Sequence, residues 1–281
     1  MLASVQALLE HAQRERHALG AFNVYNLEGV QAVIGAAEQA HSPAILQVHP
    51  AALAHGGQPL LALCLAAARD TDRAIGVHLD HAASDSAIRL ALAAGLTSIM
   101  ADGSQLPYAE NVAFSRAMVD LAHAQGAAVE AELGRLAGTE DNLTVEAYAA
   151  RLTDPEQAAE FAAATGIDAL AVCIGNVHGR YPGEPRLDFE RLAALRRGLA
   201  LPLVLHGASG LPPALVRRGI ELGVCKFNVN TELRQAYVDA VRDTLAAAQT
   251  PDVLDLMRAA VGAMQAAVIA KLQLFGSAGR A

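Results

Sequence analysis

Three histidines stand where apolar runs stop, at positions typical of the ends of buried strands. His81, His178 and His206 each follow such a run, and the three runs are far apart in the chain. A single histidine at such a position is more often structural than a metal ligand, but three on three different strands favour a shared ion. Three imidazoles that leave a fourth coordination position open suit a catalytic zinc. The pattern therefore predicts a zinc site built by these three side chains.

Asp80 directly precedes the first of these histidines and is the candidate for proton transfer. Adjacent residues of a regular strand point to opposite faces, so Asp80 and His81 can face one site only if the strand ends or bulges there. His78 shares a face with Asp80 but lies one layer deeper, and we interpret it as a hydrogen-bonded histidine of the interior. We expect Asp80 to move a proton on or off a substrate hydroxyl.

Two further carboxylates close predicted strands. Asp102 ends the strand 98–101, and Glu132 ends the strand 127–131. They suit a second or mobile cation, or outer partners that orient the histidines; the alternatives are helix capping by Asp102 and surface exposure of Glu132. Because Glu130 shares a strand face with Glu132, two carboxylates there would repel each other without a cation. This repulsion favours the metal-related interpretation.

Two segments near the end of the predicted fold suit a phosphate group. The glycine-rich segment 206–210 follows the seventh strand, and 228–231 follows the eighth and opens a helix. Backbone amides of glycine-rich turns and of helix N-termini bind phosphate. Barrels of alternating strands and helices often bind it in the loops after their last two strands. The alternative is that the glycines only shape a turn and Thr231 only caps a helix. The pairing of the two segments favours a phosphate site.

A zinc with an open position, a neighbouring carboxylate and a phosphate anchor together indicate carbonyl chemistry on a sugar phosphate. Zinc would polarise a ketone and stabilise an enediolate. No lysine stands at a strand end for a Schiff base, since Lys226 lies within a strand and could face either way. A zinc hydrolase is a second enzyme class, but such barrels usually carry His-x-His on the first strand, where this chain has 22–24 as Phe-Asn-Val. A sugar-phosphate-binding barrel without turnover is the non-enzymatic alternative.

Predicted strands and helices alternate along the chain and must position these side chains. The strands are expected at 21–24, 43–48, 75–79, 98–101, 127–131, 168–174, 202–205 and 224–229. The helices are expected at 3–18, 27–40, 58–70, 84–94, 108–125, 155–165, 188–197, 212–222, 231–248 and 252–274. The longer polar segment 134–154 interrupts the alternation of strands and helices and is expected to be a functional or mobile loop.

The alternation predicts an α/β fold in which parallel strands are joined by helices. Eight such units closed on themselves make a (β/α)8 TIM barrel, here with an extra N-terminal helix and a C-terminal helical extension, in a single domain of residues 1–281. An open doubly wound sheet is the alternative. The first strand is not followed by G-x-G-x-x-G, and polar residues follow almost every strand, so the barrel is favoured.

Composition excludes several classes of function. The formal net charge of −8 argues against non-specific binding to nucleic acid or to an anionic membrane. No apolar run reaches the ~18 residues of a membrane span, and the N-terminus lacks the pattern of a secretion signal. The 3 cysteines lie in apolar runs without C-x-x-C spacing, which predicts buried thiols in a reducing cytoplasm.

Short segments distributed along the chain match one known family in order and spacing. The matching segments are Ala21–Asn23, Val77–His81, Asp102–Ser104, Glu130–Gly134, His178–Gly179, Leu205–Leu211 and Lys226–Leu233. On these motifs the chain resembles the class II, zinc-dependent fructose-bisphosphate and tagatose-bisphosphate aldolases, from about residue 3 to the C-terminus. The resemblance implies a lyase of carbohydrate metabolism that cleaves a ketose 1,6-bisphosphate into dihydroxyacetone phosphate and glyceraldehyde 3-phosphate. It also implies a homodimer or homotetramer.

The resemblance implies a role for each matching residue. It places zinc on the three histidines, a proton donor and acceptor at Asp80, and a second divalent or monovalent cation at Asp102 and Glu132. An acid or base for the dihydroxyacetone carbon would stand in the loop 134–154, where Glu140 matches best and Asp141 is close by. The expected substrate-binding residues are Asn23, Gly179, Gly207, Ala208, Ser209, Asn228, Val229, Asn230 and Thr231.

Some positions depart from the family pattern. His49 stands where a small hydroxyl residue is usual, 176–177 reads Asn-Val in place of Thr-Ala, and Asn230 replaces a commoner Ala or Asp. The family's Asp-Pro-Arg-like segment, linked to the distal phosphate, reads Thr-Pro-Asp at 250–252. A carboxylate where an arginine is expected should repel a second phosphate. A ketose 1-phosphate with a non-phosphorylated or deoxy aldehyde half is therefore the alternative substrate, unless Arg258 or Arg280 substitutes.

Overall fold

The computed structural model describes residues 1–140, 143–145, 151–179, 181, 183–247, 250 and 252–280, and for 137–140 and 143–145 it describes only the backbone. Eight strands of this part of the chain are parallel and close into a barrel, in the order β1-β2-β3-β4-β5-β8-β10-β11. The barrel strands are β1 (Leu19–Asn23), β2 (Ala44–Val48), β3 (Ile75–Ala82), β4 (Ser98–Ala101), β5 (Ala128–Leu133), β8 (Ala169–Val172), β10 (Leu203–Leu205) and β11 (Val224–Val229). The predicted (β/α)8 barrel is confirmed.

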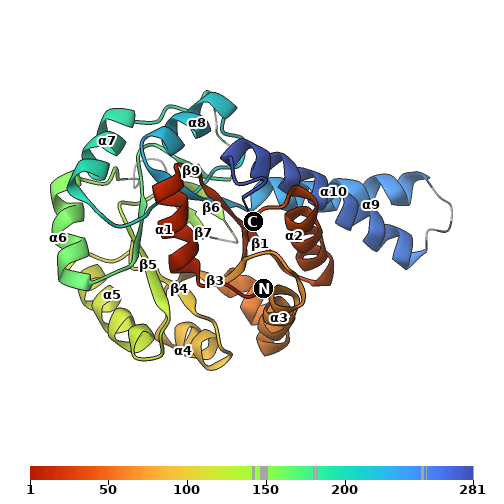
Figure 1. Ribbon diagram of the computed structural model, residues 1–281, viewed down its shortest axis with the longest axis horizontal. Coiled ribbons are helices and arrows are strands. Elements are labelled where there is room, and N and C mark those ends of the chain that lie inside the picture. The colour runs from red at the N-terminus through yellow and green to blue at the C-terminus, as the bar shows by residue number, and fades with distance from the viewer. Residues whose placement is uncertain are drawn as a thin grey trace.

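Helices surround the barrel (Figure 1). They are α1 (Val5–Glu15), α2 (Leu27–Ala40), α3 (Pro50–Asp70), α4 (Asp85–Ala93), α5 (Tyr108–His123), α6 (Pro155–Thr165), α7 (Phe189–Gly198), α8 (Pro213–Glu221), α9 (Thr231–Ala247) and α10 (Val253–Phe275). Their ends follow local signals. Asn26 accepts the Gly29 N–H at 3.0 Å where α2 begins, and Asp154 accepts the Gln157 N–H at 2.9 Å where α6 begins. Helix α6 ends at Gly166, whose φ of 74° is the left-handed conformation that suits glycine.

The barrel interior changes character from one end to the other. At the end where the strands begin, Val5 and Leu9 of α1 pack on inward-facing apolar residues such as Leu19, Ile45 and Val204. Figure 1 shows α1 lying across the barrel, where it closes this end. At the other end the inward-facing residues are polar. The fold therefore gathers the candidate site residues where the strands finish, as barrel enzymes do.

Three details of the fold differ from the expectations. Helix α3 consists of two helical stretches that meet at a kink at Gly57 with φ of 59°, so the helix expected at 58–70 follows the kink and a further stretch from Pro50 precedes it. The segment 134–154 contains β6 (Ala137–Glu140) and β7 (Leu143–Val145), so it is not a plain loop. His178 does not end a barrel strand, because it lies on a separate short strand, β9 (Val177–His178), that pairs with β6.

Helices α9 and α10 form an antiparallel pair that projects from the barrel (Figure 1). Helices α3 and α10 are each long and apolar enough to cross a membrane by length and composition, contrary to the expectation from sequence. Both pack on other elements of the barrel, α3 on β2 and β3, and α10 on α2, α9 and β1. Large apolar side chains are exposed on the projecting pair: Val238, Leu245, Val253, Leu254 and Met257.

Candidate metal and substrate site at the barrel mouth

The three predicted histidine ligands converge at the mouth of the barrel. His81, His178 and His206 each offer a ring nitrogen, and these nitrogens all lie within 4.8 Å of one another. Their ring centroids are separated by 4.6 Å to 6.1 Å. His81 and His206 are buried and His178 is partly exposed. The fold thus brings together side chains from three distant parts of the chain, one of them on the short strand β9.

The backbone of β3 resolves the conflict between adjacent residues that both point to the mouth. His81 adopts a positive φ of 44°, and the pairing of β3 with β4 shifts register between Leu79 and Ala82. This irregularity turns the imidazole to the same end of the barrel as the carboxylate of Asp80, and His81 Nε2 lies 3.8 Å from Asp80 Oδ1. A left-handed conformation at a residue other than glycine costs about 1–3 kcal/mol, and such residues concentrate at functional sites.

Carboxylates determine which nitrogen of each buried histidine can coordinate an ion. His81 Nδ1 lies 2.7 Å from Asp102 Oδ2, so coordination by His81 would use Nε2. His206 Nε2 lies 2.9 Å from Glu130 Oε1, so coordination by His206 would use Nδ1. Asp102 is thus an outer partner of a histidine, one of the three roles weighed for it. It is also one of a second group, with His81 and Glu132, whose ligand atoms lie within 4.8 Å.

Two buried polar atoms at this site fit a cation. His206 Nδ1 and Glu132 Oε2 lie 3.4 Å apart, and neither makes a hydrogen bond with any described residue. Glu132 is 2% exposed, so the surface position weighed for it is wrong. Burying these two polar atoms without hydrogen bonds is costly, and a bound metal removes that cost. Three imidazole nitrogens and a nearby carboxylate are a donor set that zinc accepts.

The Asp80 carboxylate is held in place from both sides. Asn23 Nδ2 donates to Asp80 Oδ2 at 3.0 Å, and Asn228 Nδ2 donates to Asp80 Oδ1 at 3.2 Å. Gln47 Nε2 in turn donates to Asn23 Oδ1 at 3.2 Å. Asp80 is fully buried beside the histidines. A carboxylate fixed in this way keeps one orientation toward the centre of the mouth, as a proton-transferring group requires. Asn23 and Asn228, expected to bind substrate, hold this carboxylate.

A buried ion pair lies one layer beneath the histidines, and sequence reasoning did not find it. Lys226 Nζ lies 2.9 Å from Glu130 Oε2 and donates to Asn228 Oδ1 at 2.8 Å. Both Lys226 and Glu130 point into the barrel and are almost fully buried. Lys226 is therefore the cation that offsets the repulsion expected between Glu130 and its neighbour Glu132. Side chains along β11 face inward and outward in turn, so a lysine in this strand could have been expected inside the barrel. The sequence alone did not show which way Lys226 faces.

Protonation at this site follows from burial and charge. Burial raises the pKa of Glu130, but the Lys226 ammonium and the His206 hydrogen bond outweigh it and hold this pKa well below its usual range. Burial lowers the pKa of His206, yet the hydrogen bond to Glu130 and the neighbouring Glu132 carboxylate raise it to about 9 overall. Burial, with the nearby Lys226 charge, lowers the pKa of His78 to about 3, so His78 stays neutral. His78 Nδ1 lies 2.8 Å from Ser98 Oγ, so the interior hydrogen-bonded interpretation is confirmed.

The two predicted phosphate segments lie side by side at the mouth. The Ala208 N–H donates to the Asn228 carbonyl at 3.3 Å, which joins the turn after β10 to the end of β11. Gly207 has φ of 67°, and a Cβ there would lie 2.0 Å from the Val177 carbonyl oxygen, so only glycine fits. Tyr181 donates to the Gly207 carbonyl at 3.0 Å and fixes the same turn; no motif had indicated Tyr181.

A carboxylate borders the predicted phosphate donors. The Gly210 N–H donates to Glu232 Oε1 at 2.6 Å, and the Glu232 N–H donates to Ser209 Oγ at 3.4 Å. Lys271 lies 2.7 Å from the other oxygen of Glu232 and offsets its charge. Ala208 and Ser209 are buried, and Asn230 accepts a hydrogen bond from Tyr25 at 2.9 Å. Of the remaining residues expected here, Gly179 has φ of 80°, Val229 is fully buried and Thr231 begins α9.

The predicted loop acid or base falls outside the part of the chain that can be evaluated. The backbone of Glu140 ends β6, but its side chain and all of Asp141 lie outside the described residues. His49, one of the departures from the family pattern, lies within the described residues. His49 accepts the Ala51 N–H at 3.1 Å where α3 begins, and its ring centroid lies 6.1 Å from that of His81.

Neither arginine considered for a distal phosphate lies at the mouth. Asp252 accepts the Leu254 N–H at 2.7 Å and so caps α10, with an exposed side chain. Arg258 lies on the exposed surface of α10 and pairs with Asp255 at 3.6 Å. Arg280 Nε donates to the Gly276 carbonyl, and its charge acts on His17, which lies where β1 begins at the closed end of the barrel.

Comparison with known proteins agrees with this geometry. The family described as class-II fructose-bisphosphate aldolase matches residues 3–280. The chain is 36% identical to the YdjI aldolase from Escherichia coli K12, with both chains covered at 100% and a TM-score of 0.88. It is 37% identical to a putative fructose-1,6-biphosphate aldolase from Coccidioides immitis, with 98% and 97% of the chains covered and a TM-score of 0.92. A fructose-bisphosphate aldolase from Campylobacter jejuni shares the fold at 21% identity, with 100% and 97% covered and a TM-score of 0.82.

Proposed function

The chain belongs to the class II fructose-bisphosphate aldolase family, and we propose that it cleaves ketoses phosphorylated at carbon 1 into dihydroxyacetone phosphate and an aldehyde. The observation that carries this proposal is the position of Asp80. Its carboxylate is fixed by two asparagines and lies 3.8 Å from a ring nitrogen of the histidine cluster. A fructose- or tagatose-type 1,6-bisphosphate is the first substrate to test.

The proposed metal is zinc held by His81, His178 and His206, with a second divalent or monovalent cation at Asp102 and Glu132. When bound, the zinc supplies Lewis acidity that polarises the substrate carbonyl. Asp102 and Glu130 hold two of the three imidazoles in the tautomer that leaves one nitrogen for the ion. The orphaned Nδ1 of His206 supports this assignment.

We assign each remaining step to a side chain. Asp80 removes the proton from the substrate hydroxyl that becomes the aldehyde, and returns it in the direction of synthesis. Asn23 and Asn228 keep both oxygens of Asp80 hydrogen-bonded, so the carboxylate does not rotate. The backbone of 207–209 and the start of α9 bind the phosphate of the dihydroxyacetone half, with Gly179 beside them. Glu140 is the proposed acid or base for the dihydroxyacetone carbon.

The test is a cleavage assay over a panel of ketose mono- and bisphosphates, with and without a chelator. We expect dihydroxyacetone phosphate as the common product, and complete loss of activity on full metal removal, restored by zinc. Activity that survives complete metal removal contradicts the proposed mechanism. Phosphate binding without turnover by the metal-loaded protein would instead indicate a binding barrel, and hydrolysis without carbon–carbon cleavage a hydrolase.

A specific observation favours a second candidate substrate class, the ketose 1-phosphates with a non-phosphorylated or deoxy aldehyde half. The segment that the resemblance links to the distal phosphate carries Asp252 in place of an arginine, and neither Arg258 nor Arg280 lies at the mouth. The comparison of kcat/KM for matched mono- and bisphosphates decides between the two classes. A preference for the monophosphate supports the interpretation of Asp252, and equal or better use of the bisphosphate contradicts it.

We further propose that the protein works in the cytoplasm as a homodimer or homotetramer that uses the α9–α10 pair. The five large apolar side chains exposed on this projecting pair support the proposal, because apolar side chains exposed close together are typical of a protein–protein interface. Light scattering on Leu245→Glu and Val253→Glu variants tests it. We expect a smaller assembly than that of the unchanged protein, and an unchanged mass contradicts the assignment.

A further inference from the structure

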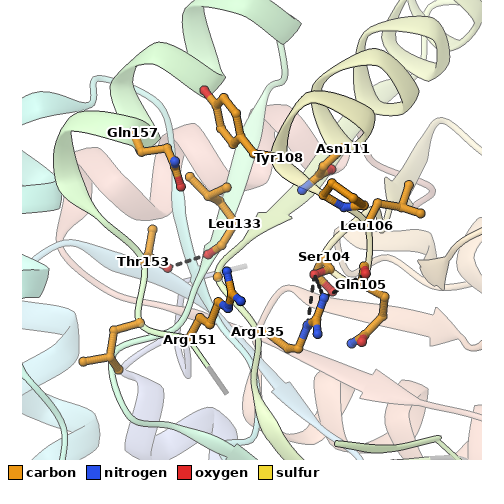
Figure 2. A pocket seen from close by; sticks show the side chains of 13 residues that line it. Ser104, Gln105, Leu106, Tyr108, Asn111, Leu133, Arg135, Arg151, Thr153 and Gln157 are labelled. Atoms are coloured by element: carbon orange, nitrogen blue, oxygen red, sulfur yellow. Dashed lines mark hydrogen bonds between the residues drawn. The ribbon is translucent and has the colours of Figure 1, made fainter. Parts of the chain in front are cut away.

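A cavity of about 390 Å³ lies outside the barrel axis, between the N-terminal ends of α5 and α6 and the ends of β4 and β5 (Figure 2). Two guanidinium groups line it, those of Arg135 and Arg151. None of the described residues that line the cavity is aspartate or glutamate. The protein as a whole carries a net charge of −8, so a partly open cavity with two arginines and no carboxylate among its described lining residues contrasts with the overall charge.

No carboxylate of the described residues pairs with Arg135 or Arg151. Arg135 donates to the carbonyl of Ser104 at 3.3 Å and to that of Gln105 at 2.8 Å, as Figure 2 shows for Ser104. These carbonyls fix the guanidinium but carry no charge. Among the described residues, the Arg151 side chain has no hydrogen-bond or ion-pair partner, and its backbone pairs with that of Arg135. An anion between the two guanidiniums would accept charge-assisted hydrogen bonds from both.

Arg135 and Arg151 lie near the N-terminal ends of helices, whereas basic side chains are usual near the C-terminal ends. Helix N-termini carry a positive partial charge, so basic side chains are favoured at the other end of a helix. Helix α5 begins at Tyr108 without a side-chain cap, which leaves its first amides facing the same region. The start of α6 carries its own carboxylates, Asp154 and Glu156, and Glu110 lies in the first turn of α5, but none of the three lines the cavity. Arg135 and Arg151 therefore add positive charge beside two helix N-termini, where a bound anion would be stabilised.

A second cavity, of about 450 Å³ at the closed end of the barrel, provides the contrast. It is lined by Arg16, Arg196 and Arg197. These arginines lie at the C-terminal ends of α1 and α7, and Arg196 donates to the carbonyls of Leu199 and Leu201. Capping of helix C-termini accounts for them. The arginines of the first cavity do not lie at helix C-termini, so this explanation does not apply to them.

We propose that the first cavity binds a small phosphate-bearing metabolite, at a site separate from the catalytic phosphate site. Two guanidiniums match the two negative charges of a phosphate monoester, and the volume admits further atoms beyond the phosphate. A chain of hydrogen bonds links this cavity to the histidine cluster. Arg135 contacts Ser104, the Ser104 N–H donates to Asp102 Oδ1 at 3.0 Å, and Asp102 Oδ2 lies 2.7 Å from His81 Nδ1.

The experiment is a calorimetric titration of the full-length protein with inorganic phosphate at low ionic strength, where screening is weak. We expect two phosphate sites in the unchanged protein. Arg151→Gln should weaken one of them by about tenfold or more, because a charge-assisted contact is lost, while the KM for the ketose phosphate stays the same. Arg151 is exposed and makes no contact that folding requires, so this variant should fold normally.

Two further variants make the result decisive. Arg197→Gln removes a guanidinium from the cavity at the closed end and should change neither phosphate site. Ser209→Ala should weaken the other site and raise the KM, which separates the two sites. A single phosphate site in the unchanged protein overturns the proposal, and so does an Arg151→Gln variant that binds phosphate as the unchanged protein does. The calorimetric titration of Arg151→Gln does not depend on turnover, so it tests this site even if the proposed aldolase activity fails; only the KM comparisons rest on that activity.

Discussion

The two ends of the barrel are built from the same strands, but the side chains in the interior are apolar at one end and charged at the other. At the closed end, α1 packs apolar side chains into the interior, and Leu9 and Leu19 are at most 3% exposed. At the mouth, the interior holds Asp80, Glu130 and Lys226, each at most 3% exposed. Buried charges of this kind contribute little net stability, because desolvation offsets their attraction. Their presence at one end only indicates that the closed end stabilises the fold while the mouth is organised for chemistry.

The largest expected effect at the mouth is on catalysis. Asp80→Asn keeps the side-chain size but removes the proton acceptor, and we expect kcat to fall by about 10²–10⁴-fold. Zinc content should remain that of the unchanged protein, since Asp80 is not among the proposed ligands. Steady-state kinetics and metal analysis of the same sample check both points. Retention of more than about a tenth of the activity would remove Asp80 from its proposed role.

Glu130→Gln is expected to affect both metal binding and stability. The substitution loses the charge that orients His206 and leaves Lys226 buried without its counter-ion. We expect zinc affinity to fall by about 10–100-fold and the free energy of unfolding to fall by about 3–5 kcal/mol. Competition with a zinc chelator and denaturant unfolding measure these effects. Glu10→Gln, on the surface of α1, is the matched control and should change neither.

Leu9→Ala tests the other end of the barrel. Removal of this buried side chain should lower the free energy of unfolding by about 2–5 kcal/mol, with kcat and zinc affinity unchanged below the unfolding midpoint. Denaturant unfolding and kinetics on one preparation distinguish the two outcomes. If Leu9→Ala lowers kcat as strongly as it lowers stability, the two ends of the barrel are not separable in the way described.

The smallest expected effect concerns pH and the closed end. Burial and the charges of Arg280 and His11 lower the pKa of His17 to about 4, from a usual value of 6.5. Because the folded state disfavours protonation, His17 contributes full stability above pH 6.5, and this contribution is lost as pH falls toward 4. Replacement by Gln should therefore flatten the fall in stability between pH 6.5 and 4. An equally steep fall in His17→Gln, measured by thermal unfolding, contradicts this account.

The barrel was predictable because each strand is a short apolar run that ends in polar residues. Local patterns fixed all eight barrel strands and identified Asp80, His81 and His206, since these residues follow the runs directly. The position of His178 on β9 was not predictable in this way. Strand β9 is short and pairs with β6, a contact between distant segments that no local pattern records.

Side-chain direction within the barrel was the second limit of the sequence. Lys226 occurs in an apolar strand, and only its contact with Glu130, far away in the chain, shows that it faces inward. The positive φ of His81 likewise depends on how β3 meets β4, because a histidine has no intrinsic preference for that conformation. The arginine-lined cavity was also not predictable, since Arg135 and Arg151 lie within the segment 134–154, which sequence alone gave as a loop.

The central claim is that three imidazoles at the barrel mouth hold one metal ion. X-ray absorption at the zinc edge, combined with metal analysis, tests it most directly on the zinc-loaded protein. We expect one zinc per chain, with histidine nitrogens at about 2.0–2.1 Å, and loss of this signal in His206→Ala. A zinc bound without histidine nitrogens, or an unchanged spectrum in that variant, would contradict the account.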